Sequence, residues 1–268
     1  MLLKRFINKL SKTIHAQHIN IAKTIYANFM FVPFRAAIKF PVLIYGHSRI
    51  LGKGKIVFIG KQLKRGQLKI GISDGVRSCF EKNYIEIEGK MECGDCVVIR
   101  RGAKIKITKY GVLRLDDNVF IGDNNTIISV CNIHIGDSTR VGNNTTFMDT
   151  DFHYIINTKT KKVHKHYSPI CIGKNNWIGG NCIIKKGAST PKGTILAGPF
   201  SMIGKNYVGL IPECSILGGT PAKLIVENMR RINNDNVSKM LSQYFKENSD
   251  DFEFGEHDSL EEICLPVK

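Results

Sequence analysis

The chain has 268 residues, of which 43% are hydrophobic and 23% charged, a globular composition that excludes a wholly disordered protein. Lysine and arginine number 39 against 23 aspartate and glutamate residues, so the formal net charge is +16 at pH 7. The sequence has no uncharged apolar stretch of about 18 residues, so no transmembrane helix is predicted. It also lacks zinc-finger, RNP and helix-turn-helix patterns, so no nucleic-acid partner is expected.

Residues 1–50 form a basic stretch with eight lysine or arginine residues and no acidic residue. Apolar residues recur at helical spacing over 6–30, which predicts an amphipathic helix. Two interpretations stay open for the segment 1–48. It caps the end of the domain that follows, or residues 1–40 also contact anionic membrane lipid. Because no cleavage site follows, we expect a cytoplasmic protein, peripheral to the inner face of the cytoplasmic membrane under the second interpretation.

Aliphatic residues recur every six positions through the middle of the chain. An interval of six is even and keeps one face of a strand inward, whereas on an α-helix it would carry apolar residues around the surface. Glycine, asparagine and aspartate between the aliphatic residues supply bends. The pattern predicts a solenoid of short strands whose coils stack about 4.8 Å apart. The three series are Leu115, Ile121 and Ile127; Ile135, Val141 and Phe147; and Ile172, Ile178, Ile184, Thr190, Leu196 and Met202.

The hexads are interrupted by a polar, basic stretch at 152–169, where we expect an external loop, because a solenoid carries insertions on its outside. Residues 224–248 are predicted to be helical, and the last twenty residues to form an acidic tail. The expected organisation is therefore a capping segment at 1–48, a solenoid domain at 49–226, and a C-terminal helix with an acidic tail at 227–268.

The repeats contain the runs Ile135-Gly136-Asp137 and Ile172-Gly173-Lys174-Asn175, and they close on Gly218-Gly219-Thr220-Pro221. These motifs resemble those of the hexapeptide-repeat acyltransferases, strongly over 110–226 and more weakly over 50–110. The resemblance implies an all-β fold, a left-handed parallel β-helix with three hexads in each coil. The subgroup indicated is that of the galactoside/maltose O-acetyltransferases and the O-acetyltransferases of bacterial surface polysaccharides.

His153 stands where a regular hexad ends and the loop begins, close to Asp149 and Asp151. In the resembled enzymes a histidine at this place is the general base, and imidazole titrates near neutral pH as such a base must. The resemblance thus implies that His153 takes the proton of a sugar hydroxyl as it attacks the thioester of acetyl-CoA. Asp149 and Asp151 are both candidates to orient the histidine, and the sequence leaves the choice open.

The resemblance also implies residues for the acceptor and the acyl donor. Asn124, in an Asn-x-Thr-Ile sequence, matches a residue that holds the acceptor hydroxyl, with a bend asparagine as the alternative. Trp177 is a candidate wall of the pantetheine channel, with packing at a solenoid corner as the alternative. No metal is expected. The candidates for contact with acetyl-CoA are Gly179, Gly180, Ala197, Gly204, Lys205 and Lys223.

These residues predict an O-acetyltransferase in the biosynthesis of a capsule, O-antigen or exopolysaccharide, with a saccharide acceptor that is free or lipid-linked. The resembled enzymes are homotrimers. The resemblance therefore implies three sites, each with His153 from one subunit and part of the CoA channel from the next.

Other functions stay open. A solenoid that only binds partners would explain the repeat without catalysis, and serine or an amino sugar would be an alternative acceptor. A metal site of the γ-carbonic-anhydrase kind needs three histidines, but only His134 and His153 lie among the repeats. His164 and His166 are expected on the loop surface, and the pair Cys93 and Cys96 lacks the second pair of a zinc site.

Overall fold

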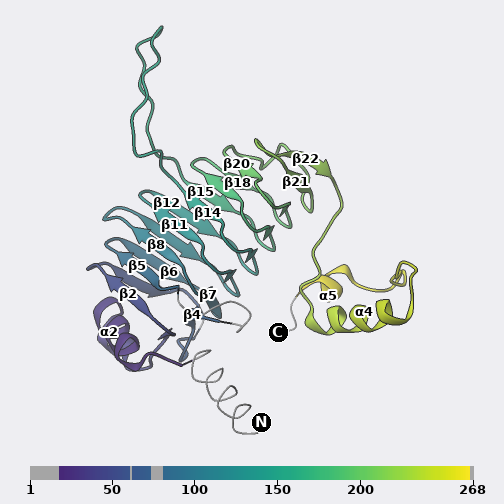
Figure 1. The fold of residues 1–268 in the computed structure, drawn as a ribbon, viewed down its shortest axis with the longest axis horizontal. Coiled ribbons are helices and arrows are strands. Elements are labelled where there is room, and N and C mark those ends of the chain that lie inside the picture. The colour runs from purple at the N-terminus through teal and green to yellow at the C-terminus, as the bar shows by residue number, and fades with distance from the viewer. Residues whose placement is uncertain (1–17, 61, 74–80, 266–268) are drawn as a thin grey trace, which may run out of the picture.

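The computed structural model describes residues 18–60, 62–73 and 81–265, so the first part of the helix expected over 6–30 lies outside the described residues. Within them, short strands wind into a left-handed parallel β-helix, which confirms the expected fold class (Figure 1). Each full coil adds one strand to each of three sheets, and neighbouring coils pair in parallel.

The strands follow one another around the coil from the first sheet to the second and then the third. The first sheet contains β1 (Val42–Ile44), β4 (Leu68–Ile72), β7 (Val97–Arg100), β10 (Phe120–Ile121), β13 (Arg140–Val141), β16 (Trp177–Ile178), β19 (Ile195–Leu196), β21 (Ile216–Gly218) and the antiparallel β22 (Lys223–Val226). The second contains β2 (Ser48–Leu51), β5 (Asn83–Ile87), β8 (Lys104–Ile107), β11 (Thr126–Ser129), β14 (Thr146–Met148), β17 (Ile183–Lys185) and β20 (Met202–Ile203). The third contains β3 (Lys55–Phe58), β6 (Lys90–Cys93), β9 (Val112–Leu115), β12 (Asn132–Ile135), β15 (Ile170–Ile172) and β18 (Ser189–Thr190).

The hexad residues form ladders inside the solenoid. Val141 pairs in register with Ile121 of the preceding coil and Ile178 of the next, and all three side chains are buried. Thr190, the polar member of the series, is buried too, and its hydroxyl donates a 2.8 Å hydrogen bond to Asn176 Oδ1. This bond satisfies the hydroxyl, so a polar residue is tolerated within an apolar ladder.

The corners between strands depend on asparagine and glycine, as the bend pattern predicts. Asn124 and Asn181 adopt φ angles of 58° and 57°, a left-handed conformation that asparagine accepts more readily than most residues. At Gly142 a Cβ atom would stand 2.5 Å from the backbone nitrogen of Gly180 in the next coil. Only glycine allows the coils to approach so closely there.

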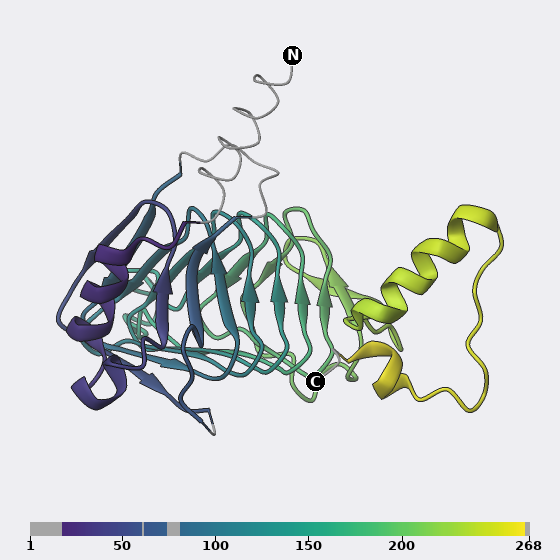
Figure 2. The same ribbon diagram turned by 90° about the horizontal axis from the view of Figure 1, so that it is seen from below.

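A helix closes the first end of the solenoid. Helix α2 (Ile21–Phe31) is followed by the short α3 (Phe34–Ala37), and α2 lies across the end of the coils (Figures 1 and 2). The side chain of Asn28 accepts a hydrogen bond from the Val42 amide at 3.1 Å and donates one to the Val42 carbonyl at 2.7 Å. This pairing satisfies the backbone groups of Val42 at the edge of β1, as the capping interpretation requires.

The loop between β14 and β15 forms a hairpin that stands away from the coils, visible as the long teal extension in Figure 1. Antiparallel bridges join Thr150 to Tyr167 and Ile156 to Val163. The hairpin leaves the solenoid at the corner between the second and third sheets. It is the external loop that the interrupted hexads predict.

The C-terminal part differs from the expected helix over 224–248. Residues 223–226 instead form β22, in which Lys223, Leu224 and Val226 pair with the open edge strand β21 and Ile225 lies at a bulge. Helix α4 (Asp235–Glu247) begins later, and the expected acidic tail contains α5 (Leu260–Cys264). Among the described helices, none has the length and apolar character needed to span a membrane.

Candidate active site

The base of the hairpin and the following coil enclose a hollow of about 350 Å³, which we call the histidine hollow. Its position at the corner between the second and third sheets follows from the loop, which leaves the coil after β14. Three imidazole rings, two lysines and one carboxylate line it together with apolar loop residues. The lining residues are Asp151, His153, Ile155, Ile156, Asn157, His164, Lys165, His166 and Lys186.

His153 is exposed in this hollow. Its ring has no hydrogen-bond partner among the residues that the structure describes, so both ring nitrogens are open to a ligand or a hydroxyl group. An imidazole with both nitrogens open can take a proton from a hydroxyl group and return it.

His166 is held more rigidly than His153. Its Nδ1 lies 2.9 Å from the hydroxyl oxygen of Thr150, and its ring makes edge contacts with Tyr154 and Tyr167, with centroids 4.7 and 5.1 Å away. His164 is exposed on the loop, as expected, His166 is half-buried, and both line the histidine hollow.

Asp149 is fully buried and does not line the hollow. Its carboxylate accepts hydrogen bonds from the backbone amides of Val130 and Cys131 at 2.8 and 2.9 Å, and from the Ser129 hydroxyl at 3.2 Å. These donors belong to the turn between β11 and β12 in the preceding coil. Asp149 therefore ties the base of the hairpin to the solenoid.

Asp151 lies in the hollow and contacts the next coil. Its carboxylate oxygen is 2.7 Å from Lys186 Nζ, and Lys185 Nζ lies 4.0 Å away. The Asp151 amide also donates a 2.7 Å hydrogen bond to the carbonyl of His166. Neither Asp151 nor Asp149 has a hydrogen bond to His153 within the described part of the chain.

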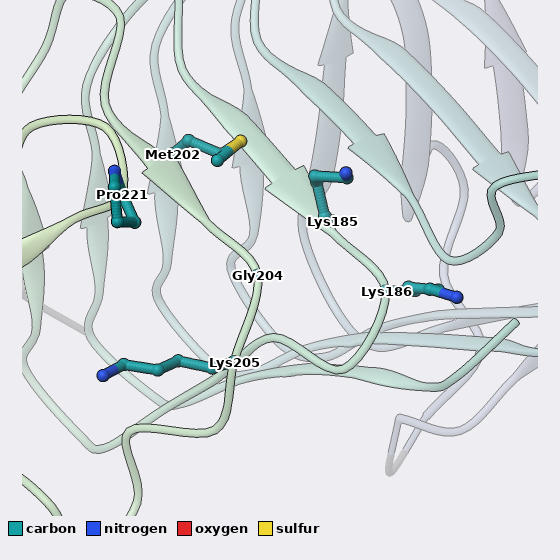
Figure 3. A pocket seen from close by; sticks show the side chains of 6 residues that line it. All are labelled: Lys185, Lys186, Met202, Gly204, Lys205 and Pro221. Carbon is teal, nitrogen blue, oxygen red and sulfur yellow. The ribbon is translucent and has the colours of Figure 1, made fainter. Parts of the chain in front are cut away.

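A second hollow of about 300 Å³ adjoins the first, and we call it the lysine hollow. Figure 3 shows Lys185 and Met202 on neighbouring strands, and Lys186 and Lys205 on the turns that follow them. Gly204 and Pro221 complete the lining. Three lysines line this small hollow, although Lys186 Nζ is also paired with Asp151. Their positive charges favour phosphate. Lys186 lines both hollows, so the basic region continues directly into the histidine hollow.

The remaining predicted residues lie elsewhere on the coil. Asn124, Gly179, Gly180 and Ala197 occupy corners between the first and second sheets, across the second sheet from His153. Within a single chain, the predicted site residues therefore lie at two opposite edges of the second sheet.

Two further candidates lie on the first sheet. Trp177 stands on β16, 42% exposed, and the guanidinium carbon of Arg231 lies 5.3 Å from its ring centroid. Lys223 begins β22 and is exposed. Neither side chain reaches the histidine hollow of the same chain.

The sequence interpretation did not single out Lys185 and Lys186. A signal for them exists, because Lys185 pairs in register with Met148, directly before the loop. Aligning the coils across the interruption would have placed both lysines beside the start of the hairpin.

The described residues contain no group of three or more histidine, cysteine, aspartate or glutamate side chains arranged to hold a metal ion.

No protein-family model matches the chain. A probable acetyltransferase of Mycobacterium tuberculosis is 28% identical over 166 residues, which cover 61% of this chain and 51% of that protein. The chain thus spans about half the length of this relative. WbbJ of Escherichia coli, named as a lipopolysaccharide biosynthesis O-acetyl transferase, is 26% identical over 152 residues, 53% of this chain and 74% of WbbJ.

Among solved structures, the polysialic acid O-acetyltransferase OatWY superimposes with a TM-score of 0.51 at 19% identity, over 76% of this chain and 94% of OatWY. This likeness supports the β-helix fold. The relatives named as acetyltransferases confirm the resemblance to acyltransferases that the repeat motifs indicate.

Proposed function

We propose that the protein is an O-acetyltransferase that moves an acetyl group from acetyl-CoA to a hydroxyl of a bacterial capsule, O-antigen or exopolysaccharide. One observation carries the proposal: the imidazole of His153, which has no hydrogen-bond partner among the described residues, lines a hollow that shares Lys186 with a hollow lined by three lysines. Acyl transfer from an acyl-CoA requires a proton acceptor and a positively charged site for the phosphates. The similarity to WbbJ supports a saccharide acceptor.

In this mechanism His153 takes the proton of the acceptor hydroxyl, and the oxygen attacks the carbonyl carbon of the thioester. The new C–O bond forms, the C–S bond breaks, and protonated His153 returns the proton to the departing CoA sulfur. Lys185, Lys186 and Lys205 pair with the phosphates of CoA, because ammonium groups form charge-assisted hydrogen bonds with phosphate oxygens. The transfer is direct and forms no acyl-enzyme.

Asp151, rather than Asp149, positions the catalytic histidine in this proposal. The oxygens of Asp149 already accept hydrogen bonds from Ser129, Val130 and Cys131 within the fold. Asp151 lines the same hollow as His153 and is itself fixed by Lys186. The exposed His153 ring would turn to this carboxylate in the reacting complex.

The active form is proposed to be a homotrimer with sites between neighbouring solenoids. Asn124, Gly179, Gly180 and Ala197 line the edge of the second sheet opposite His153, so a neighbour is needed to bring both edges together. The outward side chains between these edges include the apolar Met148, Ile183 and Met202, and Ile183 is 44% exposed. An exposed apolar face of this kind favours packing against another subunit.

We also propose a peripheral contact of the N-terminal cap with anionic lipid at the inner face of the cytoplasmic membrane. Ile21 is 71% exposed and Phe34 is 72% exposed, and Lys23, Arg35 and Lys39 lie in the same segment. Apolar side chains that insert and cations that pair with headgroups are the two contributions to such binding. This contact would bring the enzyme to a lipid-linked saccharide.

The activity is tested by incubating the purified protein with acetyl-CoA and chemically de-O-acetylated surface polysaccharides. CoA release is followed by thiol titration, and the acetyl ester is identified by NMR. Release that requires a polysaccharide and yields an ester supports the proposal. CoA release that occurs only with serine or an amino sugar contradicts the proposal. The absence of CoA release with every acceptor tested contradicts it too.

A further inference from the structure

A second cluster of reactive side chains lies on the outer face of the third sheet, outside both hollows. The Cys171 Sγ is 3.9 Å from Nδ1 of His134, and Nε2 of the same ring is 2.7 Å from Asp116 Oδ2. Arg114 Nε donates a 2.7 Å hydrogen bond to the other Asp116 oxygen. The three groups stand in the order thiol, imidazole and carboxylate.

The β-helix register brings these residues together. His134 on β12 pairs with Arg114 on β9 and with Cys171 on β15, so the three side chains form an outward row on successive coils. Asp116 follows β9 and reaches the ring from the adjacent corner. Cys171 is exposed, whereas Asp116 is only 7% exposed, so a buried carboxylate supports a thiol that solvent reaches.

The hydrogen bonds fix the tautomer of His134. Because Asp116 accepts the Nε2–H, the neutral ring carries its lone pair on Nδ1, directed at the thiol of Cys171. The ring can therefore take the thiol proton and leave a thiolate beside an imidazolium, which is the arrangement that activates nucleophilic cysteines.

The electrostatic surroundings favour this charge separation. The hydrogen bond with Cys171 raises the pKa of His134. Burial lowers this pKa, but the contact with Asp116 raises it further, so the net shift is upward. The hydrogen bond with His134 in turn lowers the pKa of Cys171. Burial opposes ionisation of Asp116, but hydrogen bonds from Arg114 and His134 outweigh it and lower its pKa.

We propose that Cys171, activated by His134 and Asp116, is a thiol-modification site that forms a mixed disulfide with low-molecular-weight disulfides of the glutathione disulfide class. The thiolate attacks one sulfur of the disulfide, the S–S bond breaks, and a Cys171–S–S–R bond forms. The second sulfur leaves as a thiolate, which takes its proton from the His134 imidazolium. The low-molecular-weight disulfide is itself the oxidant, so the exchange needs no other.

The test is a rate measurement with glutathione disulfide on the full-length protein between pH 6 and 8.5, with sites quantified by peptide mass spectrometry. Cys96 is an internal control, because it is exposed and has no histidine contact among the described residues. Buried Cys182 is a fold control, which stays unmodified while the solenoid is intact.

We expect Cys171 to react about tenfold faster than Cys96 at pH 7 and to keep more of its rate at pH 6, since an ordinary thiol has a pKa of roughly 8.5. His134→Gln should lower the Cys171 rate to that of Cys96, and Asp116→Asn should lower it partly. Equal rates and pH profiles for the two thiols would overturn the proposal. So would an unchanged Cys171 rate in His134→Gln with Cys182 still protected.

Discussion

Lys186 Nζ lies 2.7 Å from the carboxylate of Asp151, and this ion pair joins the histidine hollow to the lysine hollow. The pair crosses from the base of the hairpin to the end of β17, so it also fixes the hairpin on the next coil. In the proposed reaction it places the base and the phosphate-binding lysines on one continuous surface.

Lys186→Ala is expected to raise the KM for acetyl-CoA about tenfold, because one charge-assisted contact to phosphate is worth about 1–3 kcal/mol, and to lower kcat as well, because Asp151 loses the partner that fixes it. Initial-rate kinetics at varied acetyl-CoA measure this effect. Lys174→Ala is the matched control, since Lys174 pairs with Asp137 at a corner remote from both hollows. An equal rise in KM for both variants would assign the effect to overall charge instead.

The two aspartates of the hairpin base are expected to separate stability from activity. Asp149→Asn places an amide NH₂ among hydrogen-bond donors in a fully buried place and should lower the free energy of unfolding by about 1–3 kcal/mol. Asp151→Asn should leave the melting temperature nearly unchanged, because Asp151 is partly exposed, and should lower kcat and shift its pH profile.

Thermal unfolding and pH-dependent kinetics of both variants provide the check. A fully active Asp151→Asn protein would remove this residue from the positioning role.

The repeat explains why so much of the fold could be predicted. Within one series the spacing of six is even, so Leu115, Ile121 and Ile127 all point into the core. The bends were predictable for a similar reason, since asparagine at φ near 57°, as at Asn181, is a local preference.

Features that depend on long-range pairing could not be predicted in the same way. Lys186 reaches Asp151 only because β17 stacks on β14, and that stacking depends on how the hairpin returns. Leu224 and Val226 pair with β21 for the same kind of reason, since an open sheet edge outweighs a local helical pattern. The hydrogen bond from the Val130 amide of the preceding coil to Asp149 likewise cannot be predicted from a local motif.

Mixed trimers test whether each site is shared by two subunits. His153→Ala and Asn124→Ala are each expected to be inactive or nearly so as homotrimers. When the two variants are refolded or expressed together, some interfaces pair an intact His153 with an intact Asn124, so activity should return to a fraction of the wild-type level. Activity of tagged, purified mixed oligomers measures this recovery. Its absence in stable mixed trimers would place both residues in the site of one chain.

The N-terminal cap is expected to bind vesicles that contain phosphatidylglycerol at low salt and to release them at high salt, because each cation near the surface contributes roughly 1 kcal/mol. Co-sedimentation measures the bound fraction. Phe34→Ser and Arg35→Gln should each weaken binding. Lys239→Gln, on α4 beyond the opposite end of the solenoid, should not (Figure 1). Equal binding by all three variants would show that the cap is not the contact.

The most direct test of the account is the rate of acetyl transfer by His153→Ala at saturating acetyl-CoA. Removing a general base should lower kcat by about 10²–10⁴, while the melting temperature and the affinity for CoA stay near wild type, because the exposed ring makes no hydrogen bond within the described residues. Acetyl-ester formation followed by NMR, with CoA affinity from calorimetry on the same sample, gives both quantities. A folded His153→Ala protein that binds CoA and acetylates at the wild-type rate would contradict the account.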